Sequence, residues 1–197
     1  MSMLRPFRIL FALLFLATTA LAKPLVVIDA GHGGHDRGGM PGQKIPEKHY
    51  ALDVAKRLES LLKSAGYRTV MTRRSDVFVG LGSRCAIANK NRNSILVSIH
   101  FNGAKNYDAY GIETYYYKGS NSAKLASAIH RAVLSSTGSV DRRVRSRGFF
   151  VLRKTRVPAV LCELGFLTNK GEAKKIASSS YRQRLAEAVA RGVKACY

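Results

Sequence analysis

The chain has 197 residues, of which 33 are Lys or Arg and 12 are Asp or Glu, so its net charge at neutral pH is +21. This length corresponds to one domain large enough to bury a real core, and no linker, repeat or low-complexity block divides it. The spacing of the three cysteines matches neither a zinc ribbon nor a disulfide framework, which excludes small domains that are stabilised by zinc or by disulfide bonds.

The first 22 residues predict a secretory signal peptide. Arg5 and Arg8 precede an apolar run at residues 9–16, and residues 20–22 (Ala-Leu-Ala) provide a small-x-small cleavage site. The run is too short to span a bilayer, and an uncleaved N-terminal anchor is the alternative if the apolar stretch continues up to that site. Cleavage there removes two arginines and leaves a mature domain, residues 23–197, with a net charge of +19. We therefore expect an exported protein of the periplasm, the cell envelope or the extracellular medium.

The positive charge indicates an affinity for polyanions. For an exported protein these are the anionic polymers of the envelope and lipid headgroups, and plain solubility is the alternative explanation of the charge. The basic residues are scattered along the predicted helices, and no aromatic-interleaved platform for single strands stands out. No nucleic-acid partner is therefore expected.

Three cysteines in an oxidising compartment leave at least one thiol unpaired in a monomer. Cys162 is predicted to be a core residue, because side chains alternate along a strand and it must point away from the face that carries Glu163. The sequence leaves open whether Cys85 and Cys196 form a disulfide.

Strand and helix patterns alternate along the chain. Short β-branched or alternating runs predict strands at residues 24–29, 68–73, 94–102, 111–118, 148–154 and 158–166. Amphipathic runs predict helices at residues 47–66, 81–91, 122–138 and 181–196, and Gly66 and Gly138 are natural helix ends. This alternation predicts an α/β fold: a single domain with a mixed, mostly parallel central sheet and helices on both faces.

Four polar residues lie where such a sheet places its ligands. His32 follows the first strand in the Gly-rich loop AGHGGHDRGG, His100 ends the strand SILVSIHFN, and Glu163 interrupts the apolar strand PAVLCELGF. Glu47 lies in the first turn of a helix. Zinc hydrolases keep three ligands drawn from His and carboxylate and leave a position for water, and His32, Glu47 and His100 fit that stoichiometry.

Each of these residues has an ordinary structural explanation when taken alone. His32 fits a surface loop, His100 fits a satisfied strand end, and Glu47 complements the helix dipole. An ionised carboxylate such as that of Glu163 is costly to bury unless it is paired, so a sheet edge open to water is its simplest explanation. Only the four residues taken together favour a hydrolytic metal site.

The motifs VVIDAGHGGHDRGG, IPEKHYALDVAKRL, LVSIHFN and PAVLCELGFLTN, in this order, resemble a zinc-dependent N-acetylmuramoyl-L-alanine amidase of the bacterial cell-wall amidase family, which includes the cell-division amidases. The resemblance covers nearly all of residues 25–197. It implies that His32, Glu47 and His100 hold one Zn²⁺ ion and that Glu163 is the catalytic carboxylate. It further implies a peptidoglycan substrate, cut at the amide between the lactyl group of N-acetylmuramic acid and the L-alanine of the stem peptide.

The other candidate site residues are weaker. Asp29 precedes the loop and is a candidate to orient a ligand histidine, with a hydrogen bond to the loop backbone as the alternative. Arg73, Arg84 and Arg147 match basic positions of the family pattern and are candidates to bind substrate carboxylates, with surface charge or a structural ion pair as the alternative.

Two departures from the family pattern carry predictions. Some members have a long insertion with a helix that blocks the zinc, whereas residues 101–161 here show ordinary strands and one helix. We therefore expect no self-inhibition of that kind. The sequence does not say whether the enzyme needs a protein activator. Phe101 stands where a small residue commonly follows the ligand, which predicts a narrower pocket.

The rival functions are a zinc peptidase that cuts within the stem peptide and a non-catalytic envelope-binding protein.

Overall fold

The structure, a computed structural model, describes residues 22–40, 43 and 45–197. In chain order the elements are β1 (Leu25–Ala30), α1 (Glu47–Ser64), β2 (Thr69–Met71), α2 (Leu81–Asn89), β3 (Ser94–Asn102), β4 (Ile112–Tyr116), α3 (Ser120–Thr137), β5 (Asp141–Ser146), α4 (Phe150–Lys154), β6 (Ala159–Phe166), α5 (Lys170–Ala177) and α6 (Ser179–Lys194). The predicted signal peptide lies outside the described residues and stays a prediction. Among the described residues, none of the helices combines the length and apolar character that crossing a membrane demands.

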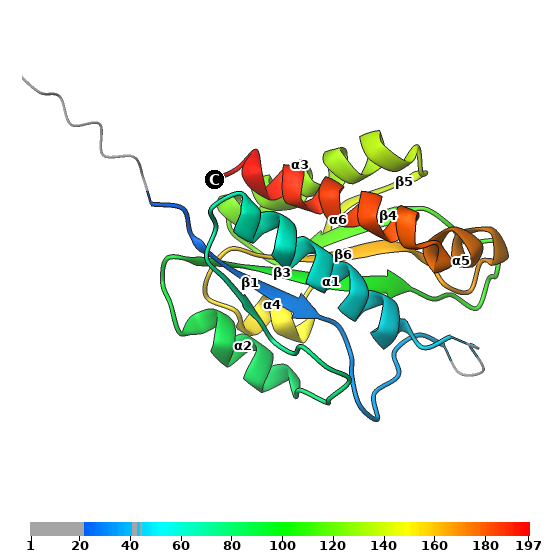
Figure 1. Cartoon of the computed structure of the whole chain (residues 1–197), viewed down its shortest axis with the longest axis horizontal. Helices are drawn as coiled ribbons and strands as arrows, with labels where there is room; N and C mark the ends of the chain where they lie inside the picture. Colours follow the sequence, from blue (N-terminus) through cyan, green and yellow to red (C-terminus); the bar gives the residue numbers. More distant parts are fainter. Residues whose placement is uncertain (1–21, 41–42, 44) are drawn as a thin grey trace, which may run out of the picture.

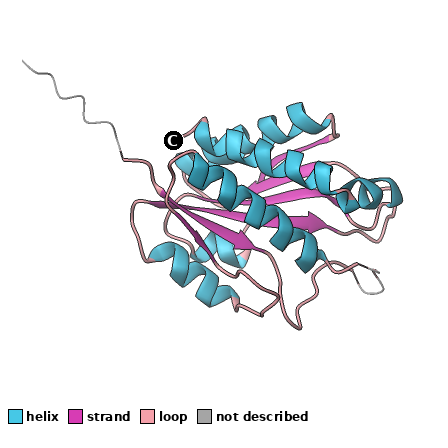
Figure 2. Cartoon of the chain, in the orientation of Figure 1, coloured by secondary structure: helices cyan, strands magenta, loops and turns pink. Residues whose placement is uncertain are grey.

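The strands form one sheet in the order β2-β1-β3-β6-β4-β5 (Figure 2). Strands β2, β1, β3 and β6 pair in parallel, as do β4 and β5, and only the β4–β6 pair in this described sheet is antiparallel. The predicted mixed, mostly parallel sheet is therefore confirmed. Its two central strands, β3 and β6, carry His100 and Glu163.

Helices cover both faces of the sheet, as predicted. Figure 1 shows α1, α6 and α3 side by side along one face and α2 and α4 on the other. The α1 face has the larger apolar core, to which β3 contributes Ile95, Val97, Ile99 and Phe101. The α2–α4 face has a smaller apolar cluster that includes Leu96 and Leu161. Because neighbouring residues of a strand point to opposite faces, each strand supplies both layers.

Helix α1 follows its predicted pattern. Val54, Leu58 and Leu62 are fully buried on one stripe. The helix stops just before Gly66, whose φ of +79° is the left-handed conformation that favours glycine after a helix end.

Residues 148–154 differ from their prediction as a strand. They contain the short helix α4, which buries Val151 and Leu152 and leaves Phe149 and Phe150 exposed. The strand at this point is β5, which was not predicted because its sequence DRRVRS holds a single apolar residue, Val144. As an edge strand, β5 needs little apolar character.

The three cysteines pack on different faces of the sheet. Cys162 is fully buried in the core on the α1 face, opposite Glu163 along the strand, as predicted. Cys85 packs in the cluster on the α2–α4 face, whereas Cys196 packs against the α1 face. The open question of a Cys85–Cys196 disulfide is thereby answered, since all three thiols are free.

Candidate active site

The Gly-rich loop after β1 brings His32 against the end of β3. His32 has a φ of +58°, a left-handed conformation that is uncommon for a residue with a side chain. A Cβ atom at Gly31 would overlap the ring of His100, and one at Gly38 would overlap His32 and Glu47. Glycine at these two positions therefore allows the backbone to pass directly beside the imidazoles.

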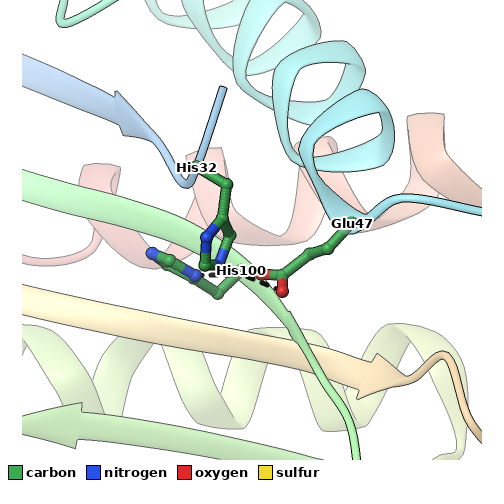
Figure 3. Close-up of side chains that lie close together, drawn as sticks. All are labelled: His32, Glu47 and His100. Atoms are coloured by element: carbon green, nitrogen blue, oxygen red, sulfur yellow. Dashed lines mark hydrogen bonds and ion pairs between the residues drawn. The ribbon is translucent and has the colours of Figure 1, made fainter. Parts of the chain in front are cut away.

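Three side chains from separate elements converge at this point. Figure 3 shows His32 from the loop, Glu47 from the start of α1 and His100 from β3 pointing toward one another. Glu47 Oε2 lies 3.1 Å from His32 Nε2, and Glu47 Oε1 lies 2.9 Å from His100 Nδ1. One ligand atom from each residue lies within 4.8 Å of the other two. The candidate metal ligands named from the sequence are thus brought together.

The chemistry of this donor set fits a zinc ion. Two imidazole nitrogens and one carboxylate oxygen are the usual ligands of catalytic zinc. Burial opposes the ionisation of Glu47, but hydrogen bonds with His100 and His32 outweigh it and lower the Glu47 pKa to about 2. The histidine side chains keep 23% and 16% of their surface exposed against 4% for Glu47. The cluster is therefore open to solvent on the histidine side, where a substrate would enter.

A further carboxylate holds the first histidine. Nδ1 of His32 lies 2.9 Å from both carboxylate oxygens of Asp36, which leaves Nε2 to face Glu47. Asp36 is itself held by the Gly38 N–H. A carboxylate behind a ligand histidine orients the ring and raises its basicity. The sequence analysis missed Asp36, although its position four residues after His32 in the same loop was an available signal.

Glu163 lies beside the three ligands. It pairs in register with His100 of β3 and with Glu113 of β4, so the three side chains point to the α2–α4 face in one row. Glu163 sits inside β6 rather than at its end, as the strand continues to Phe166.

The Oε2 atom of Glu163 is buried and has no hydrogen-bond partner among the described residues. Burial, with the charges of Glu47 and Glu113, raises its pKa well above the usual value. Such an orphaned acceptor fits a site completed by a cation and water.

Glu113, by contrast, has hydrogen-bond partners for both of its carboxylate oxygens. Its Oε2 accepts hydrogen bonds from Asn102 Nδ2 at 2.8 Å and from the Tyr115 hydroxyl at 2.6 Å, and its Oε1 lies 3.0 Å from Arg142 Nε. This network fixes a second buried carboxylate next to Glu163. The sequence analysis missed Glu113, because its partners come from three different strands.

An apolar cleft of about 390 Å³ opens onto the site. Its lining includes His32 and His100 together with Phe78, Phe149 and Phe150, which are among the most exposed large apolar side chains of the described chain. Exposed aromatic residues beside a polar centre are typical of ligand sites. The cleft thus offers a wall for the non-reacting parts of a substrate.

Comparisons with known proteins agree with this geometry. The N-acetylmuramoyl-L-alanine amidase family matches residues 26–195. The chain belongs to the N-acetylmuramoyl-L-alanine amidases. The catalytic domain of CwlV, an amidase from Bacillus (Paenibacillus) polymyxa var. colistinus, is 36% identical with a TM-score of 0.83, and the match covers 87% of this chain and 97% of that domain. The CwlD amidase of Clostridioides difficile, solved with the GerS lipoprotein, has a TM-score of 0.83 at 26% identity over 88% of this chain and 98% of CwlD.

Among sequence relatives, the amidase LytC of Bacillus subtilis is 34% identical over 175 residues, or 87% of this chain. The matched region is 35% of LytC, so this chain spans about a third of the length of that relative. Family membership and fold are thereby shown, as the resemblance implied. The match to the amidase family extends over residues 26–195.

Two of the arginines suggested as substrate ligands have other roles in this amidase domain. Arg73 is buried and donates to the carbonyl oxygens of Ala30, Gly31 and Lys48. Arg84 is buried as well and pairs with Asp29 at 2.7 Å. Both guanidinium groups are therefore engaged by groups of the protein itself. These contacts favour the alternative, a structural role for both residues, because the loop that carries His32 uses their hydrogen-bonding capacity. Their binding of a substrate carboxylate stays a prediction.

Asp29 also differs from the suggestion that it orients a histidine. It is fully buried, and its oxygens accept hydrogen bonds from Thr72, Ser98 and Arg84 rather than from an imidazole. Burial opposes its ionisation, but the charge of Arg84 helps to hold the Asp29 pKa below its usual value. Asp29 is linked to the site through Arg84, which donates to the His32 carbonyl oxygen at 2.7 Å.

Phe101 does not narrow the pocket. It is 1% exposed in the core on the α1 face, 6.1 Å from the ring of Tyr50, because it follows His100 in the strand and points the opposite way. Its N–H donates to Glu47 Oε1 at 2.9 Å, so its backbone rather than its ring serves the site. Arg147 is exposed, and its proposed contact with substrate stays a prediction.

Proposed function

We propose that this chain is an exported zinc amidase that hydrolyses the amide between the lactyl group of N-acetylmuramic acid and the L-alanine of the peptidoglycan stem peptide. The observation that carries the proposal is the His32–Glu47–His100 cluster with the buried, unpartnered oxygen of Glu163 on the strand beside His100. The family match, whose relatives are named as amidases of this bond, supports the same reaction.

The proposed mechanism assigns one task to each residue. His32, Glu47 and His100 would hold one Zn²⁺ ion, with Asp36 orienting His32. When bound, zinc supplies Lewis acidity, because it lowers the pKa of water towards about 7 and polarises a carbonyl oxygen. Glu163 takes the proton of the attacking water at Oε2 and returns it to the departing amine nitrogen. The strand on both sides of Glu163 is buried, so the base has a rigid mount.

The aromatic cleft has the complementary role. Phe78, Phe149 and Phe150 exclude water from one side of the reacting centre and give the substrate an apolar surface to lie on. Arg147, which precedes Phe149 and Phe150 and is exposed, is a candidate to bind a stem-peptide carboxylate.

The test uses the mature protein, residues 23–197, loaded with zinc and incubated with defined muropeptides, beside Glu163→Gln. Mass spectrometry should find bare glycan and intact stem peptides with a free L-alanine amine, absent in the variant. Fragments cut inside the stem would assign a zinc peptidase instead. Binding to peptidoglycan without any cleavage would support the non-catalytic alternative.

We infer that no segment of the described chain blocks the site. The stretch from Phe101 to Leu161 folds into β4, α3, β5 and α4, and both histidines open onto the cleft. The purified mature protein should therefore act on muropeptides without a partner. Because CwlD is seen with the GerS lipoprotein, dependence on a protein partner is the alternative. Marked activation by an added envelope extract, lost when that extract is treated with protease, would decide for it.

We propose further that the basic surface holds the enzyme to anionic polymers or lipid headgroups of the envelope. The net charge of +21 for the whole chain supports this. Attraction between exposed charges is screened by salt, so high salt should release the protein from purified sacculi. Retention that is independent of salt would show that another kind of contact anchors it.

A further inference from the structure

A second, larger cleft lies away from the candidate active site. Its volume is about 720 Å³, and it is bounded by the start of α3, the end of α4 and the start of β6. Ala159, at its edge, precedes Glu163 by four residues on β6, which corresponds to about 13 Å along a strand. The two clefts have no lining residue in common, although α4 borders both.

The walls of this cleft carry positive charge alone. Lys118, Arg153, Lys154 and Arg156 line it, each is exposed, and no acidic residue is among the described lining. None of these four side chains forms an ion pair within the part of the chain that the structure describes, where arginines elsewhere pair with Asp29, Asp53, Glu59 and Glu113. The scarce carboxylates of this chain are thus engaged at other places, and the cleft keeps its charge.

The N-terminus of α3 adds hydrogen-bond donors to the same cleft. Ser120, Asn121 and Ser122 line it, and the helix has 18 residues with no side-chain cap and no acidic residue in its first turn. Free N–H groups at a helix start favour an anion. Thr155 lines the cleft as well and is 7% exposed; its Oγ1 has no hydrogen-bond partner among the described residues, and the Cys85 thiol, a weak hydrogen-bonding group, lies beside it.

We propose that this cleft binds a phosphodiester-bearing polymer of the cell envelope, as a docking site separate from the hydrolytic centre. Arginine forks and helix N–H groups match phosphate oxygens in geometry and charge. A concave site suits a single polymer chain, whereas a bilayer surface needs a protruding face with exposed apolar side chains. The exposed phenylalanines lie at the other cleft, so the polymer rather than the membrane is the occupant.

The test removes the charge of the cleft and compares it with an equal loss elsewhere. One variant combines Lys118→Gln, Arg153→Gln, Lys154→Gln and Arg156→Gln. The matched control has the same net charge and carries Gln at four exposed positions of α1, α3 and α6, namely Lys56, Arg131, Arg184 and Lys194. The probe is a synthetic poly(glycerol phosphate) oligomer, and its affinity for each mature protein is measured by titration at several salt concentrations.

The cleft variant should bind the oligomer at least about tenfold more weakly, with a shallower salt dependence, and the control should stay close to the unmodified protein. An equal loss in both variants would reduce the effect to net charge and overturn the proposal. So would a loss confined to vesicles of phosphatidylglycerol or to a single-stranded oligonucleotide. Cleavage of soluble muropeptides should be unchanged in both variants, and this readout separates the docking site from the proposed hydrolysis.

Discussion

The two faces of the sheet differ in what they bury. Toward α1, α3 and α6 the central strands present apolar side chains, with Ile99, Phe101, Cys162 and Leu164 all nearly or fully buried. Toward α2 and α4 the next residues of the same strands are polar, and the row His100–Glu163–Glu113 crosses three strands. The same strands thus build the core on one face and the candidate reaction centre on the other, because side chains alternate along a strand.

The polar face is stable because nearly every charge on it has a partner. Asp29 is paired with Arg84, Glu113 with Arg142 and Tyr115, and Glu47 with two histidines. Glu163 is the exception, with one buried oxygen left over. Unpaired buried polar groups cost free energy, so a fold retains one where function uses it. The difference between the faces can be tested by substitutions on each.

The largest effect is expected on the polar face, from Glu163→Gln. The turnover of muropeptides should fall by about 10²- to 10⁴-fold, because a general base is lost. The free energy of unfolding should stay the same or rise, because a neutral amide is easier to bury than a carboxylate. Rate assays and denaturant titrations measure the two quantities. A fall in both would give Glu163 a structural role, and Glu187→Gln on α6 is the control.

A core substitution on the other face should show the reverse pattern. Phe101→Ala should lower the free energy of unfolding by about 3–5 kcal/mol, because it leaves a cavity in the α1-face core. Phe149→Ala removes an aromatic ring that is 41% exposed and should change stability by at most about 0.5 kcal/mol while raising KM. If Phe101→Ala altered KM at unchanged stability, its ring would belong to the pocket after all.

Breaking the buried pair that supports the loop should also cost stability. Arg84→Gln leaves Asp29 charged and unpaired in the interior, which should lower the free energy of unfolding by about 3–5 kcal/mol. Denaturant titration measures this, with Arg68→Gln on the surface as control. A variant of normal stability with a raised KM would favour a substrate role for Arg84 over the structural one.

Asp36→Asn should act on metal affinity. Loss of the carboxylate behind His32 should weaken zinc binding by about 10- to 100-fold, because the ring loses its orienting partner. Competition with a chromogenic chelator measures the affinity without any assay of activity. Asp53→Asn is the control: this carboxylate of α1 pairs with Arg57 of the same helix and with Arg182 of α6, is not hydrogen-bonded to the candidate ligand histidines, and its loss should leave zinc binding normal.

The smallest effect is expected from Arg147→Gln. If the exposed guanidinium binds a stem-peptide carboxylate at the rim, KM should rise by at most about fivefold, as exposed ion pairs contribute little. Muropeptides that lack the terminal carboxylate should show no difference between variant and parent. A rise in KM that is the same for both substrates would place Arg147 outside the substrate contacts.

Much of this architecture was readable from the pattern of residues. The alternation of short β-branched runs with amphipathic runs predicted the α/β sheet covered on both faces, and the stripe of Val54, Leu58 and Leu62 predicted the buried side of α1. Apart from residues 148–154, where the structure has the helix α4 in place of a strand, the predicted helices and strands exist where they were expected. The side of the sheet to which Phe101 points was also readable, since it must oppose the adjacent His100.

By itself the sequence determined the fold class and, through motifs that resemble the amidase family, the candidate set His32, Glu47, His100 and Glu163, because both motifs and hydrophobic patterns are local features. Only the tertiary structure decided which charges meet: Asp36 with His32, Arg84 with Asp29, and Glu113 beside Glu163. It also decided that residues 150–154 form a helix and that four cations without an ion pair among the described residues line one cleft. A buried charge takes its partner from strand register and packing between distant segments, which no local pattern encodes.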